Sequence, residues 1–221
     1  MEKSSFERHD TNFSSVQQIH IHSEKSIINC PYSFPNAKEL CFTCGLSITC
    51  PKLANLLNRI APLTKLTKMV FQYPAPPVEK IIDLLDYTPQ LHTLVFQSVH
   101  WLTRKHLLVE QSEKFRRIVK TNVIAHIIYN DVCRLDEAKF LLGLCPRIQH
   151  FSLSLDHTSG ESVIRFLLDR TNPNTCHLCV ICIRGFGKSW YERLDPLLKS
   201  ERLLDDYTLK LTDDSGLYLW W

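Results

Sequence analysis

The segment "TPQLHTLVF" (residues 88–96) contains a short pattern that decides how the chain folds. Pro89 is followed by apolar residues two, five and seven positions later. The segments "FPNAKELCF" (34–42) and "CPRIQHFSL" (145–153) have the same spacing, with Ala in the first apolar place of the former. A spacing that recurs between otherwise unlike segments indicates a repeated structural unit.

The apolar part of this pattern fits at seven places, whose first residues lie 21, 29, 25, 33, 24 and 30 positions apart. Such intervals are typical of leucine-rich repeats with irregular insertions. The last two apolar residues of each place are two positions apart, so on an extended strand they point to one face. Seven short strands are therefore expected, at Val16, Ile19 and Ile21; Ala37, Leu40 and Phe42; Leu66, Met69 and Phe71; Leu91, Leu94 and Phe96; Ile124, Ile127 and Tyr129; Ile148, Phe151 and Leu153; and Leu178, Ile181 and Ile183.

The segments between these strands have the apolar spacing of helices. Prolines such as Pro89 follow the helices, because proline cannot continue a helix and favours an extended residue before it. Pro77 and Ser162 are suited to helix starts. Helices are expected in the ranges 51–60, 77–87, 135–144, 160–170 and 191–204.

Strands that alternate with helices predict an α/β fold. We expect an irregular leucine-rich-repeat solenoid, a horseshoe with a parallel sheet on its concave face and helices outside, because no single repeat can bury its apolar side alone. Residues 1–14 would form a short N-terminal tail and residues 15–221 the repeat domain, with Trp220 and Trp221 against the apolar edge of the last repeat. The alternative is a doubly wound sheet, but the chain lacks the glycine-rich strand-to-helix turn of that fold.

The composition is that of an ordinary globular protein, since 44% of the 221 residues are hydrophobic and 22% are charged. The net charge of +3 is spread along the chain, so we expect no nucleic acid partner. No apolar run approaches the ~20 residues that span a membrane, and "MEKSSFERHD" (1–10) lacks the apolar core of a secretory signal. We therefore expect no membrane association and a cytoplasmic or nuclear location.

Several stretches resemble parts of catalytic or metal sites without completing them. "GFGKS" (185–189) contains Gly-Lys-Ser, but Cys182 stands where a P-loop has its first glycine. "HTSGES" (157–162) lacks the glycine that precedes the serine of a nucleophile elbow. The cysteines of "CFTC" (41–44) and "CHLCVIC" (176–182) lie in apolar runs without the turn residues of a zinc knuckle. We therefore expect no enzyme, no cofactor and no metal.

The passage "LCPRIQHFSL" (144–153) and the ending "LLDDYTLKLTDDSGLYLWW" (203–221) resemble the leucine-rich-repeat region of F-box-like proteins. The resemblance covers the chain from about residue 14 to the C-terminus. In that family the repeats recognise the substrate of an SCF ubiquitin ligase, and a preceding F-box docks the Skp1 adaptor. The residues before the first expected strand, "MEKSSFERHDTNFSS" (1–15), show no F-box pattern. The resemblance implies a substrate receptor in a Skp1/cullin complex, and the alternative is a stand-alone scaffold or decoy without a ligase role.

In a horseshoe of this kind, a protein target would bind on the concave face of the sheet. Apolar side chains beside neutral hydrogen-bonding ones suit a peptide or protein surface, whereas a phosphate backbone would require Lys and Arg. The central column of this face is expected to contain His20, Cys41, Val70, Val95, Ile128, Ser152 and Cys182. The column beyond it is expected to contain His22, Thr43, Gln72, Gln97, Asn130, Ser154 and Arg184.

Overall fold

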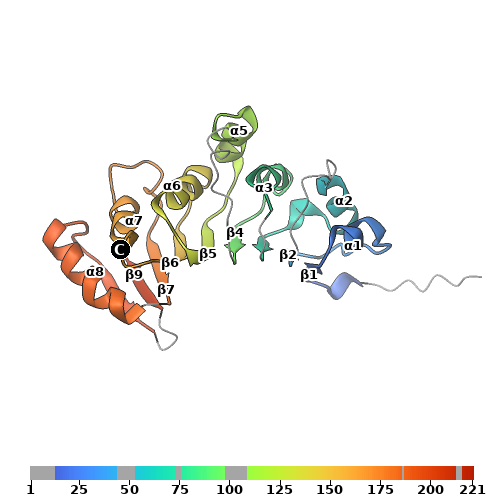
Figure 1. The fold of residues 1–221 in the computed structure, drawn as a ribbon. Coiled ribbons are helices and arrows are strands. Elements are labelled where there is room, and N and C mark those ends of the chain that lie inside the picture. Colours follow the sequence, from blue (N-terminus) through green and yellow to red (C-terminus); the bar gives the residue numbers. More distant parts are fainter. Residues whose placement is uncertain (1–12, 44–52, 73–75, 98–108, 186, 213–215) are drawn as a thin grey trace, which may run out of the picture.

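The computed structural model describes residues 13–43, 53–72, 76–97, 109–185, 187–212 and 216–221. Their strands form one nine-stranded sheet (Figure 1). The strands are β1 (Gln18–Ile21), β2 (Glu39–Phe42), β3 (Lys68–Phe71), β4 (Thr93–Phe96), β5 (His126–Val132), β6 (His150–Ser154), β7 (Val180–Arg184), β8 (Thr208–Leu211) and β9 (Leu217–Trp220). The helices are α1 (Glu24–Asn29), α2 (Leu53–Ile60), α3 (Val78–Leu85), α5 (Glu113–Thr121), α6 (Leu135–Leu144), α7 (Gly160–Leu167) and α8 (Gly187–Glu201), with 3-10 turns at Phe13–Ser15 and Leu63–Lys65.

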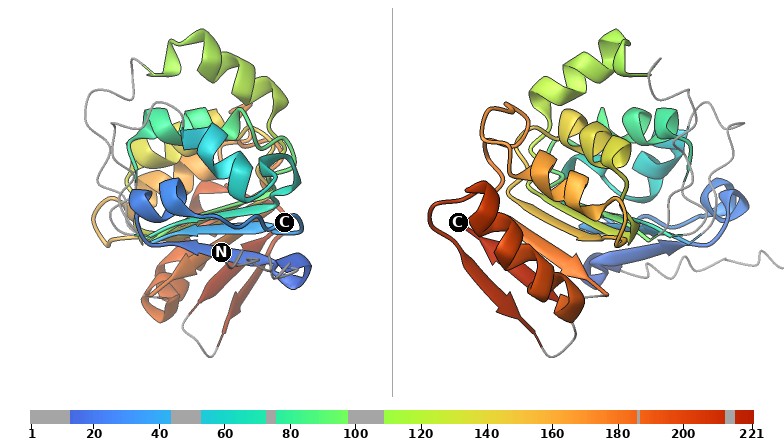
Figure 2. Two further views of the ribbon diagram at one scale, coloured as in Figure 1. Left: turned by 90° about the vertical axis from the view of Figure 1, so that its right-hand side faces the viewer. Right: turned by 60° about the vertical axis from the view of Figure 1, so that its left-hand side comes forward.

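The strands lie in the order β1-β2-β3-β4-β5-β6-β7-β9-β8. Neighbouring strands from β1 to β7 are parallel and follow the chain order, whereas β9 is antiparallel to both β7 and β8. The helices from α1 to α7 cover one side of the row of strands (Figures 1 and 2). The fold is therefore α/β with a mostly parallel sheet, and each of the seven predicted strands is confirmed.

A tight turn leads into several strands and gives the recurring proline its role. The amide of Leu91 donates a 3.1 Å hydrogen bond to the carbonyl of Thr88, three residues earlier. The segments 34–37 and 145–148 close in the same way, over 3.2 and 3.1 Å. Pro89 thus takes the second place of a four-residue turn, which its fixed φ favours. The expectation that the proline stops a helix was incomplete, because α3 has already ended before this turn.

The core lies between the sheet and the helices. The rings of Phe42, Phe71 and Phe96 are fully buried and stack along neighbouring strands, with centroids 5.3 and 5.6 Å apart. Burial of such large apolar surfaces is the main source of stability. Most of the buried apolar residues form one continuous cluster, the main core, that reaches from Ile21 in β1 to Leu219 in β9.

Four of the predicted helices are confirmed as α2, α3, α6 and α7, and α6 has the predicted bounds. α7 begins at Gly160, as the range 160–170 predicted, but Ser159 and not Ser162 stands at its start in the capping position. α8 begins at residue 187 instead of 191, because its first turn carries Trp190, which is fully buried in the core.

Two helices were not predicted from the sequence. α1 has a serine N-cap, whose side-chain oxygen accepts a 3.1 Å hydrogen bond from the amide of Ser26. α5 is capped in the same way by Ser112, which accepts from the amide of Phe115 at 3.1 Å. Both helices bury few side chains, namely Ile27 in α1 and Phe115 and Ile118 in α5.

The C-terminal segment is part of the sheet, whereas a purely parallel sheet was expected. Trp220 in β9 lies opposite Val180 in β7, and Trp221 packs half-buried against the core. The segment therefore covers the edge of the last parallel strand, as the sequence suggested, but does so as an antiparallel strand. Among the described helices, none is both long and apolar enough to cross a membrane.

Candidate recognition surface

Every second residue of the strands points away from the helices, and we call the surface that these residues form the open face. Strand register arranges it in three columns across the sheet. The central column contains His20, Cys41, Val70, Val95, Ile128, Ser152 and Cys182, and continues to Tyr218 and Lys210. One flanking column contains Gln18, Glu39, Lys68, Thr93, His126, His150 and Val180. The other contains the predicted residues His22, Thr43, Gln72, Gln97, Asn130, Ser154 and Arg184.

The register confirms that the predicted central residues lie side by side. Cys41, Val70 and Val95 form a small apolar cluster, separate from the main core, with Ile128 packed against it. Burial raises the pKa of the Cys41 thiol, so this side chain is a neutral apolar group at pH 7. Cys41, Val70 and Val95 are each less than a tenth exposed. Ile128 is half-buried and is therefore the member of the cluster that a partner can reach most directly.

The second predicted column lies beside the first, as expected. The backbone amides of Thr43, Gln72 and Gln97 each donate a hydrogen bond of 2.8 to 3.0 Å to a backbone carbonyl of the preceding strand. A bulge in β5 shifts this column, so that Val132 and not Asn130 pairs with Ser154. The bulge was not predicted, although Asn130 and Asp131 interrupt the apolar alternation at this point.

The column on the other side of the central one was missed in the sequence, although alternation places it two residues before the central residues. It carries an ion pair between Lys68 Nζ and Glu39 Oε1, 2.9 Å apart. It also carries His126 and His150, whose rings meet edge to face with centroids 5.6 Å apart. The open face is therefore more polar than the two predicted columns indicated.

A polar cluster lies where β5, β6 and β7 meet on the open face. Arg184 Nη1 donates a 2.8 Å hydrogen bond to the side-chain oxygen of Asn130. Ser152 is fully buried, and its Oγ has no hydrogen-bond partner among the described residues. The same holds for the buried Nε2 of His150. Burial, then the charges of His126 and Arg184, lower the pKa of His150, which favours the neutral imidazole.

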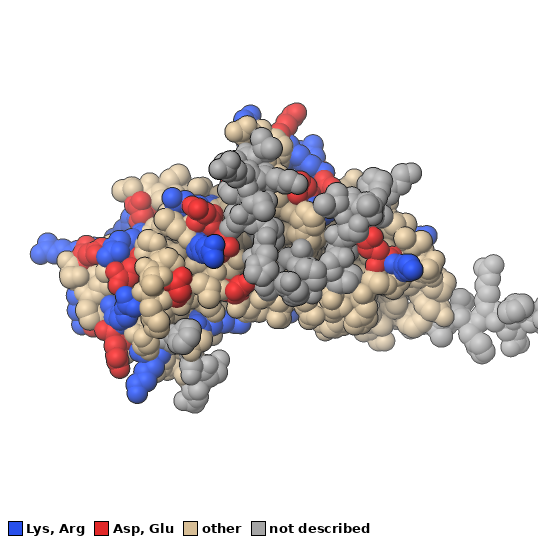
Figure 3. Space-filling view, viewed as in Figure 1, with Lys and Arg blue, Asp and Glu red and all other residues tan. Residues whose placement is uncertain are grey.

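The open face has a positive excess near its C-terminal strands. Arg184 and Lys210 are exposed, and the one described carboxylate in the three columns, Glu39, is paired with Lys68. Viewed from the side, charged side chains gather over the C-terminal elements, whereas the lower edge below β1 to β4 is mostly uncharged (Figure 3). A mostly uncharged part of the open face therefore adjoins the part that carries Arg184 and Lys210.

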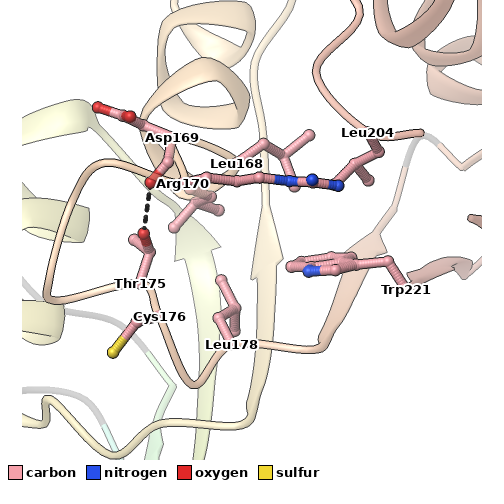
Figure 4. A pocket seen from close by; sticks show the side chains of 9 residues that line it. Leu168, Asp169, Arg170, Thr175, Cys176, Leu178, Leu204 and Trp221 are labelled. Atoms are coloured by element: carbon pink, nitrogen blue, oxygen red, sulfur yellow. Dashed lines mark hydrogen bonds between the residues drawn. The ribbon is translucent and has the colours of Figure 1, made fainter. Parts of the chain in front are cut away.

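A separate pocket of about 260 Å³ lies at the C-terminal end of α7, beside Leu178 and Trp221 (Figure 4). Arg170 extends along its edge and pairs with Asp205 at 3.1 Å. The threonine in its wall, Thr175, donates a 2.8 Å hydrogen bond to a backbone carbonyl. The polar groups of this pocket thus have partners within the chain.

The cysteines of "CHLCVIC" (176–182) do not converge on one site in the described part of the chain. Cys176 and Cys179 are exposed, whereas Cys182 is buried in β7. Within the described ranges, no three His, Cys, Asp or Glu side chains are placed to hold a metal ion. Cys44 of the first cysteine pair lies outside the described residues.

Comparisons of the chain with protein-family models, with curated proteins and with solved structures found no match.

Proposed function

We propose that the chain is a protein-recognition module that binds a protein segment on its open face. The fold would be an irregular leucine-rich-repeat solenoid, with the open face as its concave side. The observation that carries the proposal is the cluster of Cys41, Val70, Val95 and Ile128, which lies on the helix-free side of the sheet and is separate from the main core. A half-buried apolar side chain between hydrogen-bonding columns offers an anchor for affinity and polar groups for orientation.

The same backbone hydrogen-bond pattern recurs where neighbouring strands begin, which supports a stack of similar units. The carbonyl of Lys38 accepts from the amides of both Thr67 and Lys68, over 2.9 and 3.1 Å. The carbonyl of Thr67 accepts from the two amides at 92–93 in the next unit, over 2.9 and 3.0 Å. Each unit then contacts mainly its neighbours, as in repeat proteins.

The resemblance to the repeat region of F-box-like proteins gives this module a role. It would hold a target on the open face while a Skp1/cullin complex places a ubiquitin-loaded enzyme nearby. The module would contribute no catalytic side chain, cofactor or metal. The protein would be located in the cytoplasm or the nucleus. A stand-alone scaffold or decoy, which binds the target without a ligase, is the second candidate.

Affinity purification from the native cells, followed by mass spectrometry, tests both candidates. The bait would be the tagged chain, its Gln72→Lys/Gln97→Lys variant on the open face and an Arg116→Ala control on α5. Partners that the double variant loses and the control keeps would support recognition by the open face. Skp1 and a cullin among them would support the ligase role, and their absence would favour the scaffold. If all three baits recovered the same partners in the same amounts, the result would contradict the proposal.

A further inference from the structure

We propose that the open face selects an acidic segment, in which an Asp or Glu side chain binds beside Arg184 and an apolar residue packs on Ile128. This inference rests on the proposed function and names the chemistry of the partner. Three observations carry it: the unneutralised charge of Arg184, the unpartnered polar atoms beside it and the apolar cluster across the neighbouring strands.

Arg184 is held in place without losing its charge. Its partner, Asn130, accepts the 2.8 Å hydrogen bond through a neutral amide oxygen. Within the described part of the chain, no carboxylate pairs with Arg184. Some surface arginines differ, since Arg117 pairs with Asp86 at 2.7 Å and Arg165 with a glutamate at the same distance. A positioned guanidinium with free N–H groups suits a carboxylate.

Ser152 and His150 supply further hydrogen-bonding groups at this place. They lie two residues apart on β6, on the same face and roughly 7 Å from each other along the strand. Ser152 is fully buried, and its unpartnered Oγ lies in the central column between Ile128 and Cys182. A buried polar group without a partner is costly, so a ligand oxygen that accepts from this hydroxyl would remove a cost already present in the free protein.

The spacing of the two subsites sets the length of the segment. Ile128 and Asn130 lie two residues apart on β5, and Arg184 Nη1 reaches over β6 to within 2.8 Å of the Asn130 side-chain oxygen. Two residues of a strand span roughly 7 Å, which an extended chain covers in about two residues. The partner would therefore carry its acidic and apolar residues about two positions apart. The positive excess on this side of the open face, with Lys210 beyond Arg184, would attract such a segment.

Selection of peptides from a phage-displayed random dodecapeptide library, with the immobilised full chain as target, tests this inference. The enriched peptides would be synthesised, and their affinities measured for the wild type and for Arg184→Gln, which removes the charge and keeps a hydrogen-bonding amide. Arg116→Ala, which removes an exposed arginine from α5, is the matched control. Thermal melting of each variant shows that it is folded.

We expect the enriched peptides to carry Asp or Glu near an apolar residue, and Arg184→Gln to weaken their binding at least tenfold while Arg116→Ala does not. Peptides without acidic residues, which Arg184→Gln binds normally and Gln72→Lys/Gln97→Lys does not, would overturn the acidic preference and leave recognition by the open face intact. No enrichment, or binding that no open-face change affects, would overturn both the inference and the proposed function. An acidic preference that persists in Arg184→Gln would overturn the role of Arg184.

Discussion

Arg184 in β7 and Asn130 in β5 are joined by a 2.8 Å hydrogen bond that passes over the intervening strand β6. The two residues are 54 positions apart in the chain. Parallel stacking of the repeats brings them together, and the bulge in β5 displaces Asn130 from the pairing with Ser154. The bond orients the guanidinium and leaves its positive charge available at the surface.

This relationship predicts the effect of Asn130→Asp. The new carboxylate would pair with Arg184, and an exposed ion pair of this kind changes the free energy of unfolding by only about 0–1 kcal/mol. The variant should therefore melt like the wild type and yet lose affinity for acidic peptides, because the charge of Arg184 is neutralised. Calorimetric melting and peptide titration measure the two effects. Unchanged affinity for acidic peptides would show that Arg184 does not contact them.

The contact between α7 and α8 predicts opposite results for two glycines. A Cβ on Gly160 would overlap the Trp190 ring, which is fully buried and whose Nε1 donates to the Leu155 carbonyl. Because the ring cannot move away, Gly160→Ala should lower the free energy of unfolding by about 1–3 kcal/mol.

Gly143 in α6 is the matched control, because a Cβ there would meet nothing within 4 Å. Gly143→Ala should raise the free energy of unfolding by about 0.5–1 kcal/mol, since alanine restricts the unfolded chain more than glycine does. Urea denaturation measures both variants. Equal stabilities for the two would show that α8 does not pack on α7 in this way.

The turn before α7 depends on an ionised Asp156. Its carboxylate accepts four hydrogen bonds of 2.6 to 2.8 Å from the amides and hydroxyls of Thr158 and Ser159, which hold its pKa well below the usual range. Because the folded pKa is lower than the unfolded one, this stabilisation is present above about pH 4 and is lost as the pH falls further.

Asp156→Ala should therefore cost about 1–2 kcal/mol of unfolding free energy at pH 7. Its difference from the wild type should shrink below about pH 4, where this carboxyl group begins to be protonated in the unfolded wild-type chain while it stays ionised in the folded protein. Asp206→Ala, in an exposed loop, is the control and should melt like the wild type. Melting curves from pH 7 to pH 3 measure this effect, and a constant difference over that range would contradict the role of the charge.

The lowered pKa of His150 predicts a second pH effect, in the neutral range. The folded protein binds fewer protons at this position than the unfolded chain does, so stability should decrease as the pH falls below the ordinary value of 6.5. Its neighbours on the open face, His126 and Arg184, oppose protonation, as does burial. His150→Gln should flatten this dependence, whereas His177→Gln, in an exposed turn, should not. Chemical denaturation at pH 5, 6 and 7 shows whether the slope belongs to His150.

The sequence predicted the parallel strands well because their pattern is local. Leu94 and Phe96 are two positions apart and lie on the same buried side, and the preceding turn is recognisable from Pro89. The antiparallel strands β8 and β9 were missed because their placement depends on contacts with β7, far from them in the chain. Most residues of β8, such as Lys210, are exposed, so this edge strand lacks the alternation of buried and exposed residues that predicts a strand.

The candidate surface was predicted in part for the same reason. Alternation places Val95 and Gln97 on one side of the sheet, and the register then aligns each with its neighbours. The polar cluster could not be predicted, because it depends on the bulge in β5 and on the burial of Ser152. Neither property can be read from the local sequence, since both arise from how neighbouring repeats stack.

The most direct test of recognition by the open face is site-specific photo-crosslinking in the native cells. A photoreactive amino acid would replace Gln97, which is exposed on the open face, or Tyr191, which is exposed on α8. We predict that position 97 gives a defined cross-linked protein, that position 191 does not give it, and that adding Arg184→Gln to the position 97 variant reduces its yield. The same products from both positions, or no product from position 97, would contradict the account.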